Sequence, residues 1–107
     1  MVDPIIEGKV RDYVQRLRAR GMDVRRALLY GSQARGTARA DSDIDVLLLT
    51  DDASGERYWP QSNLAWEIAD DVDWRIEPVL CGTRDYDEND WHPLIDVAKR
   101  EGIEIKV

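Results

Sequence analysis

Two aspartates, Asp43 and Asp45, open an apolar run that ends at Thr50. Residues two apart on a strand share a face, with Cα atoms roughly 6.5 Å apart. Two carboxylates this close repel each other, and without a cation one of them would tend to hold its proton. A divalent metal ion removes that conflict, and Mg²⁺ favours carboxylate oxygens together with substrate phosphates. The pair therefore predicts half of a metal–phosphate site.

The loop before this pair has the composition of a phosphate-binding turn. Gly31 and Ser32 directly follow an apolar run. Glycine lets backbone N–H groups approach an anion closely, and serine adds a hydroxyl donor. A helix that begins at Ser32 would also favour a phosphate at its N-terminus. Arg35 can reach phosphate oxygens with a planar fork of donors, or it can pair with an aspartate of its own loop, and the sequence leaves both open.

These residues resemble a known signature. Gly31-Ser32, ten intervening residues and Asp43-Ile44-Asp45 are similar to the G-S-x10-D-x-D pattern of the DNA polymerase β-like nucleotidyltransferase superfamily. The wider string GSQARGTARADSDIDVLLL resembles the minimal nucleotidyltransferases, also called the MNT family. The resemblance implies an α/β fold with a small mixed β-sheet flanked by helices, in a single minimal domain over residues 1–107.

The resemblance also implies a reaction and its cofactors. Members of the superfamily move a nucleoside monophosphate from a nucleoside triphosphate, such as AMP from ATP, onto an acceptor hydroxyl and release pyrophosphate. Two Mg²⁺ ions, roughly 3.5–4 Å apart in such sites, clamp the attacking and leaving oxygens. By this resemblance, Asp43 and Asp45 are catalytic and hold both ions. Gly31 and Ser32 would bind the β- and γ-phosphates, and Arg35 would neutralise phosphate charge.

The family uses a third carboxylate on a neighbouring strand, which helps to bind the metal ion that activates the acceptor. Glu77 and Asp73 are the candidates, because they share one face if residues 72–80 form a strand. We favour Glu77 as the catalytic and metal-binding residue, since an unpaired carboxylate among apolar neighbours would be costly. The segment RIEP also resembles the corresponding strand of small members. Asp73 stays open, either as a solvated residue or as the ligand with Glu77 paired to Arg75.

Hydrophobic periodicity predicts the elements that would position this site. Asp3-Pro4 has the residue types of a helix cap and first turn, and Gly21 those of a stop. Helices are expected over residues 4–20, 60–70 and 91–100, and strands over residues 24–30, 44–50, 72–80 and 103–107. Residues 31–42 are expected to form a turn or short helix and a loop, and residues 51–57 and 82–90 to form loops. Alternating helices and strands predict an α/β domain.

Charge and cysteine content exclude several classes of protein. The chain has 22 acidic and 15 basic residues, a formal charge of −7, which disfavours broad binding to a nucleic-acid backbone. Cys81 is the single cysteine, so no intramolecular disulfide or cysteine-rich zinc site is possible, in keeping with a reducing compartment. With no signal peptide and no apolar run of about 20 residues, we expect a cytoplasmic protein that binds no membrane.

Two classes of function remain open. Small MNT members often occur beside a helical HEPN-type ribonuclease toxin and act as antitoxins that attach AMP to it, so the resemblance implies such a partner protein or a dimer mate. The alternative is an antitoxin-type binding module that docks on that partner with little or no catalysis. Trp59 and Trp66 could stack on a nucleotide base, although their helical spacing favours the core or a partner surface, and Tyr86 is expected on such a surface. His92 is expected at the surface or at a helix cap.

Overall fold

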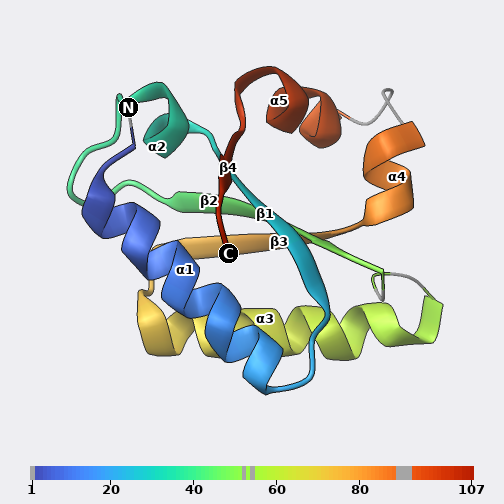
Figure 1. Cartoon of the computed structure of the whole chain (residues 1–107). Coiled ribbons are helices and arrows are strands. Elements are labelled where there is room, and N and C mark those ends of the chain that lie inside the picture. The colour runs from blue at the N-terminus through green and yellow to red at the C-terminus, as the bar shows by residue number, and fades with distance from the viewer. Residues whose placement is uncertain (1, 52, 54, 89–92) are drawn as a thin grey trace.

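The computed structural model describes residues 2–51, 53, 55–88 and 93–107. Figure 1 shows a sheet with helices on both sides. In chain order the elements are α1 (Pro4–Ala19), β1 (Val24–Tyr30), α2 (Ser32–Arg35), β2 (Ile44–Thr50), the 3-10 helix η1 (Gly55–Arg57), α3 (Tyr58–Val72), β3 (Ile76–Gly82), α4 (Thr83–Glu88), α5 (Pro93–Glu101) and β4 (Ile103–Ile105).

The sheet has four strands in the order β3-β2-β1-β4. Strand β1 runs antiparallel to β2 and β4, whereas β2 and β3 are parallel, so the sheet is mixed. One hydrophobic cluster lies between the sheet and helices α1 and α3, and a second lies under α4 and α5. The predicted α/β fold with a small mixed sheet flanked by helices is confirmed.

Strand β2 is apolar along nearly its whole length because helices cover both of its faces. Val46 and Leu48 belong to the cluster under α1 and α3, and the alternate residues Leu47 and Leu49 belong to the cluster under α4 and α5. This burial leaves one place where β2 can carry charge, which is its N-terminal end beside the turn after β1.

Helix α1 begins where the sequence predicts. The Asp3 side chain accepts a hydrogen bond from the Ile5 N–H at 2.9 Å, and Pro4 occupies the first turn. Its buried face carries apolar residues at helical spacing that pack on the sheet. No described helix is both long and apolar enough to cross a membrane.

The third strand begins later than predicted. Val72 ends α3, and Asp73 follows it in extended conformation as the residue that caps the helix. The Asp73 carboxylate accepts hydrogen bonds from the Arg75 N–H and Nε, at 2.9 and 3.0 Å, which stabilises the turn into β3. The expectation that Asp73 and Glu77 share one strand face is therefore wrong, because only Glu77 lies on the strand.

Two further expectations need correction. Residues 83–88 form helix α4 instead of a loop. Its Tyr86 is buried, with Arg26 and Lys99 over its ring, so it forms no exposed partner surface. Helix α5 begins at Pro93, and the predicted start of that helix at Trp91, together with His92, lies outside the described residues.

The tryptophans of α3 lie outside the core. Trp59 and Trp66 expose 69% and 45% of their surface, so the expectation that they pack in the core is wrong. They are seven residues apart, which places them on one face of the helix. Helix α3 itself lies on the side of the sheet opposite α2 and α5 (Figure 1).

Candidate functional site

Three polar side chains form a row across the sheet at the start of β2. Asp45 pairs in register with Glu77 of β3 on one side and with Tyr30 of β1 on the other. Residues directly opposite each other in a ladder share a face, so these three side chains stand side by side. Asp43 lies one step before β2, and its carboxyl group lies within hydrogen-bonding reach of Glu77. The structure thus places the three carboxylates that the sequence singled out at the same end of the sheet.

The carboxyl groups of this row repel one another. Burial raises the pKa of Asp45, and the Asp43 charge raises it further, whereas Arg35 lowers it. Loss of hydration, followed by the charges of Asp43 and Asp45, raises the pKa of Glu77. Burial, followed by the charges of Asp45 and Glu77, raises the pKa of Tyr30 to about 12. Negative charge is therefore costly here unless a cation shares the site.

The basis on which we favoured Glu77 needs correction, although its position supports the choice. Glu77 is exposed to solvent, so the cost of burying it among apolar residues cannot be the reason it is there. Register with Asp45 is the feature that places it in the row. A hydrophobic pattern could not reveal this pairing, because register depends on how two separate strands align.

Asp73 lies outside this row, in a buried ion-pair cluster with Lys9 and Arg75. Its carboxylate is almost fully buried, accepting a hydrogen bond from Lys9 Nζ at 2.6 Å and from Arg75 Nη2 at 2.8 Å. The hydrogen bond from Arg75 is the main reason that the pKa of Asp73 lies well below its usual range. Asp73 is therefore neither a solvated residue nor placed as a metal ligand beside Glu77, and Arg75 pairs with Asp73 instead of Glu77.

The turn after β1 requires glycine at its first position. Gly31 has φ +74° and ψ −152°, and its carbonyl oxygen accepts hydrogen bonds from the N–H groups of Ala34 and Arg35 at the start of α2. A side chain at Gly31 would collide with Oδ2 of Asp45. The missing side chain therefore lets the predicted phosphate-binding turn and the predicted metal-binding carboxylate touch.

Glu101 is a residue of this site that sequence reasoning missed. Its Oε1 accepts a hydrogen bond from the Gly31 N–H at 3.1 Å and another from Arg35 Nη1 at 2.9 Å. Arg35 therefore pairs with a carboxylate of α5, not with an aspartate of its own loop. Because 66 residues separate Arg35 from Glu101, no local motif could have indicated the pair.

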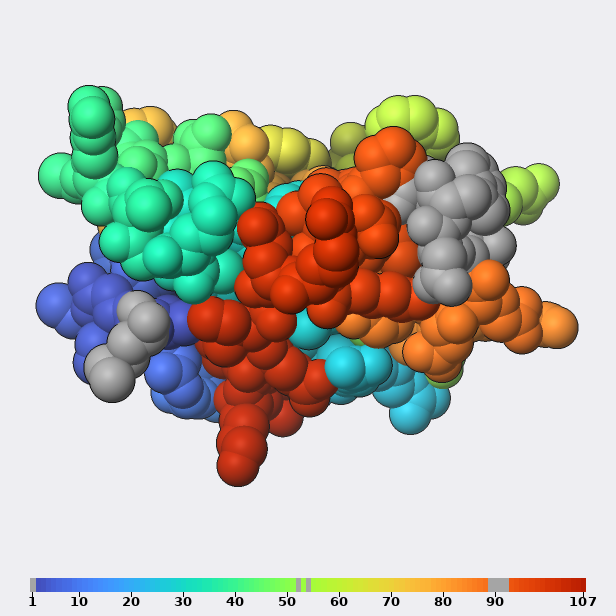
Figure 2. Space-filling model, turned by 90° about the horizontal axis from the view of Figure 1, so that it is seen from above, coloured from blue at the N-terminus to red at the C-terminus, as the bar shows by residue number. Residues whose placement is uncertain are grey.

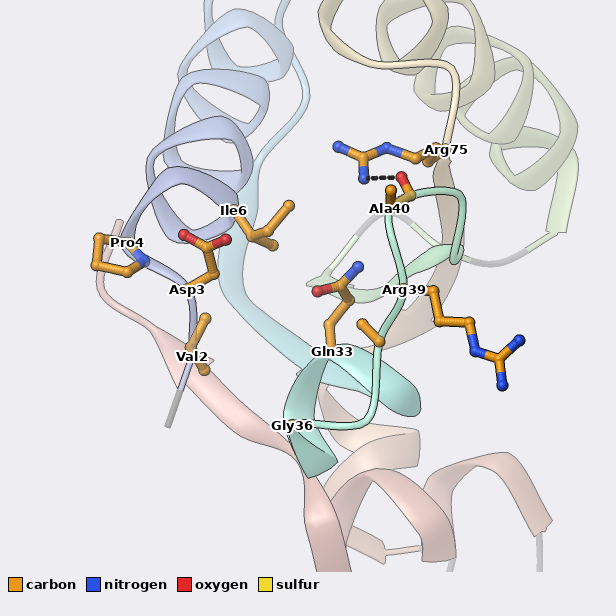
Figure 3. A pocket seen from close by; sticks show the side chains of 10 residues that line it. Val2, Asp3, Pro4, Ile6, Gln33, Gly36, Arg39, Ala40 and Arg75 are labelled. Carbon is orange, nitrogen blue, oxygen red and sulfur yellow. Dashed lines mark hydrogen bonds between the residues drawn. The ribbon is translucent and has the colours of Figure 1, made fainter.

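A hollow of about 470 Å³ lies beyond the loop that leads to Asp43 (Figure 3). The side chain of Gln33 points into it from α2 and is buried. Ile6, which belongs to the cluster under α1 and α3, also lines it, and none of the three carboxylates does. Arg75 Nη1 donates to the Ala40 carbonyl at 2.8 Å and so ties this loop to the start of β3. The hollow is thus separate from the acidic row formed by Asp43, Asp45 and Glu77. Residues 38–40 of the loop before Asp43 form part of its wall.

The donor set of the row fits divalent cations. Asp43, Asp45 and Glu77 offer carboxylate oxygens, the ligand type that Mg²⁺ prefers. A divalent cation held between them would relieve their mutual repulsion. Within the described part of the chain, no three histidine, cysteine or acidic side chains converge closely enough to hold a metal ion as they stand.

Comparison with known families decides the assignment of this fold. Residues 8–104 match the family described as nucleotidyltransferase domain. The chain belongs to the nucleotidyltransferase family. The match includes the whole acidic row, the turn at Gly31 and Glu101, and it agrees with the minimal nucleotidyltransferase resemblance. A search of curated protein sequences finds no significant match.

Solved structures show the same nucleotidyltransferase fold. A candidate nucleotidyltransferase from Sulfolobus solfataricus superposes with a TM-score of 0.63 at 14% identity, covering 92% of this chain and 78% of the other. A toxin–antitoxin complex with AMP-PNP gives 0.61 at 20% identity, covering 94% and 72%. A toxin–antitoxin MntA–HpeT mutant with two Asp-to-Glu substitutions gives 0.57 at 18% identity, covering 94% and 72%. At these identities the similarity concerns the fold alone.

Proposed function

We propose that this nucleotidyltransferase domain moves AMP from ATP onto a hydroxyl group of a partner protein, with Mg²⁺ as the cofactor. One observation carries the proposal: Asp45 touches the Gly31 turn and stands in register with Glu77. A triphosphate held at the turn would therefore lie beside the carboxylates that bind cations. The same juxtaposition would serve any nucleoside triphosphate, and ATP is chosen because a similar fold was solved with AMP-PNP.

Each residue has a defined part in this proposal. Asp43, Asp45 and Glu77 would hold two Mg²⁺ ions, which when bound would stabilise the charge of the attacking and leaving oxygens. Ser32 would donate to the β- and γ-phosphates through its N–H and hydroxyl groups. Arg35, which lowers the pKa of Asp45, lies close enough to the row to counter phosphate charge.

The transfer breaks a phosphoanhydride bond of ATP and forms a phosphate ester bond to the acceptor. The acceptor oxygen forms a bond to the α-phosphorus of ATP while the bond from that phosphorus to the bridging oxygen breaks. Pyrophosphate leaves, and the proton of the acceptor hydroxyl passes to solvent. The domain keeps the nucleotide and the acceptor in place during this exchange, which is the main contribution of the protein in phosphoryl and nucleotidyl transfer.

A partner protein is proposed because the exposed tryptophans of α3 suit an interface. Trp59 and Trp66 would be buried by a docking protein, and aromatic residues are enriched in such interfaces. Two similar folds come from toxin–antitoxin complexes, which makes a helical HEPN-type toxin the partner of choice. The same tryptophans favour a second candidate function, a binding module that neutralises its partner by docking alone.

One experiment tests the proposal and separates the two candidates. The domain is incubated with a helical HEPN-type toxin, ATP and Mg²⁺, and the intact mass of each protein is measured. Addition of AMP to the partner, lost with EDTA and in the Asp45→Asn variant, is the expected result. A partner that forms a stable complex and is inhibited without any gain in mass would overturn the transferase proposal and support the binding module.

A further inference from the structure

Glu101 connects the C-terminal end of α5 to the turn after β1. One carboxylate oxygen of Glu101 accepts hydrogen bonds from both the Gly31 backbone N–H and the Arg35 guanidinium. The Glu101 side chain exposes 27% of its surface, compared with 52% for Arg35, so the pair is partly shielded from water. Figure 2 shows α2 and α5 side by side on this face of the molecule.

The position of Glu101 is fixed by the fold around it. The N–H of Gly102 donates to the Ala98 carbonyl at 2.8 Å, which closes the last turn of α5 directly after Glu101. A side chain at Gly102 would collide with that carbonyl, so glycine is needed for this tight ending. Strand β4 then begins at Ile103, which pairs with Leu29 of β1. Glu101 is thus held between two anchored segments, close to the end of β1.

We propose that Glu101 is the positioning residue of the nucleotide-binding turn: it orients the Gly31 peptide and Arg35 so that Ser32 and Arg35 face the triphosphate. Glu101 touches neither the nucleotide nor the cations in this role. The inference rests on the proposed function, because it assigns the turn to the β- and γ-phosphates.

Contacts on both sides of the turn support this role. The Gly31 N–H donates to the Glu101 carboxylate, and the Gly31 carbonyl oxygen accepts hydrogen bonds from the N–H groups of Ala34 and Arg35. The Asp45 carboxylate fills the space beside Gly31 where a side chain would lie. An oriented backbone binds an anion better than a mobile one, because less conformational entropy is lost on binding. Since Glu101 also pairs with Arg35, that guanidinium is held at the turn, close enough to Asp45 to lower its pKa.

A matched pair of variants tests the inference. Glu101→Ala removes both hydrogen bonds, whereas Glu101→Gln keeps an acceptor oxygen and loses the charge. Glu104→Ala is the control, because Glu104 lies three residues further on and forms a similar ion pair with Arg26, at 2.6 Å, away from the turn. The affinity of each protein for Mg–ATP is measured by titration calorimetry, well below its melting temperature.

We expect about a tenfold loss of Mg–ATP affinity in Glu101→Ala, corresponding to the loss of one charge-assisted hydrogen bond. Glu101→Gln should recover part of that loss, and Glu104→Ala should stay within about twofold of the wild type. In the nucleotide-free protein, hydrogen exchange at the Gly31 amide should accelerate in Glu101→Ala while the β1–β4 ladder amides keep their rates. This pattern would show that the rest of the fold is intact, and a merely structural role would then leave the Mg–ATP affinity of the folded protein unchanged.

The outcomes separate the two proposals. If the wild-type protein binds Mg–ATP and Glu101→Ala binds it equally well, Glu101 does not position the turn, and the proposed function stands. Tighter binding by Glu101→Ala would also overturn the inference, because it would make Glu101 a competitor of the phosphates. If the wild-type protein binds no Mg–ATP, the proposed function itself fails, and the inference fails with it.

Discussion

The Asp45 carboxylate occupies the space that a side chain at Gly31 would take, at the point where β2 begins and β1 ends. This contact brings the turn after β1 and the acidic row to one end of the sheet. Both residues are needed for it: a side chain at residue 31 would occupy the space of the carboxylate, and the φ of +74° at that position disfavours any residue but glycine.

Gly31→Ala should therefore destabilise the protein and abolish Mg–ATP binding. A residue with a side chain at this φ costs about 1–3 kcal/mol, and the collision with Asp45 adds to that cost. Gly8→Ala is the control, because Gly8 lies within α1 with open space around its Cα and should stabilise the helix by about 0.5–1 kcal/mol. Urea denaturation measures both effects, and a Gly31→Ala protein as stable as the wild type would show that the turn tolerates a side chain.

The sequence predicted the parts of this site that are local. Gly31, Ser32, Asp43 and Asp45 lie within one turn and two strands, and the alternation of apolar residues sets which side chains share a face. Most strands and helices were predicted for the same reason. Register between β2 and β3 was not predictable, although it is what places Glu77 beside Asp45.

The remaining errors concern residues whose roles depend on distant partners. Asp73 was expected within the strand over residues 72–80, but it caps α3 and forms buried ion pairs with Lys9 and Arg75. Glu101 looked like an ordinary charged residue at the end of a helix. Its two hydrogen bonds exist only because β4 returns to the edge of β1 and brings α5 beside α2.

Asp45→Asn should abolish Mg²⁺-dependent ATP binding without lowering the stability of the metal-free protein. The substitution removes a cation ligand, and it also removes one of the charges that repel Asp43 and Glu77. Calorimetry with Mg–ATP and thermal unfolding in EDTA measure the two effects. Asp41→Asn, an exposed aspartate just before the pair, should bind within about twofold of the wild type. Equal losses in both variants would point to general charge instead of a defined site.

The stability of the metal-free protein should fall as the pH rises above about 4, the ordinary pKa of a carboxyl group. Because the pKa values of Asp45 and Glu77 are raised in the folded state, the folded protein binds more protons than the unfolded chain between about 4 and those raised values. The free energy of unfolding therefore decreases with pH in this window. Asp51 and Asp73 have lowered pKa values, so their contributions to the unfolding free energy change only below about pH 4, outside this window.

Urea denaturation at several pH values in EDTA checks this dependence. The decline should be shallower in Asp45→Asn, because one of the two raised groups is gone. Added Mg²⁺ should stabilise the wild-type protein more at pH 7 than at pH 4.5, since the ionised carboxylates bind the cation. A rise in stability over the same window, or an unchanged decline in Asp45→Asn, would contradict the repulsion within the row.

Asp73 and Glu77 should respond to substitution in opposite ways. Asp73→Asn leaves Lys9 and the largely buried Arg75 without their anionic partner and should cost about 3 kcal/mol of unfolding free energy. Glu77→Gln, at an exposed position, should change stability by less than about 0.5 kcal/mol. It should instead reduce AMP transfer by at least about tenfold, because it removes a carboxylate that we assign to the cations.

Urea denaturation and the intact-mass assay for AMP transfer, run on both variants, separate these roles. Asp73→Asn should retain transfer at temperatures where it stays folded, since its side chain points to Lys9 and Arg75 and not into the acidic row. Full transfer by Glu77→Gln would remove it from the cation-binding set and leave Asp43 and Asp45 as the pair that binds the ions. Loss of transfer in a fully folded Asp73→Asn protein would mean that the buried ion pair also fixes the start of β3, and with it Glu77, for the reaction.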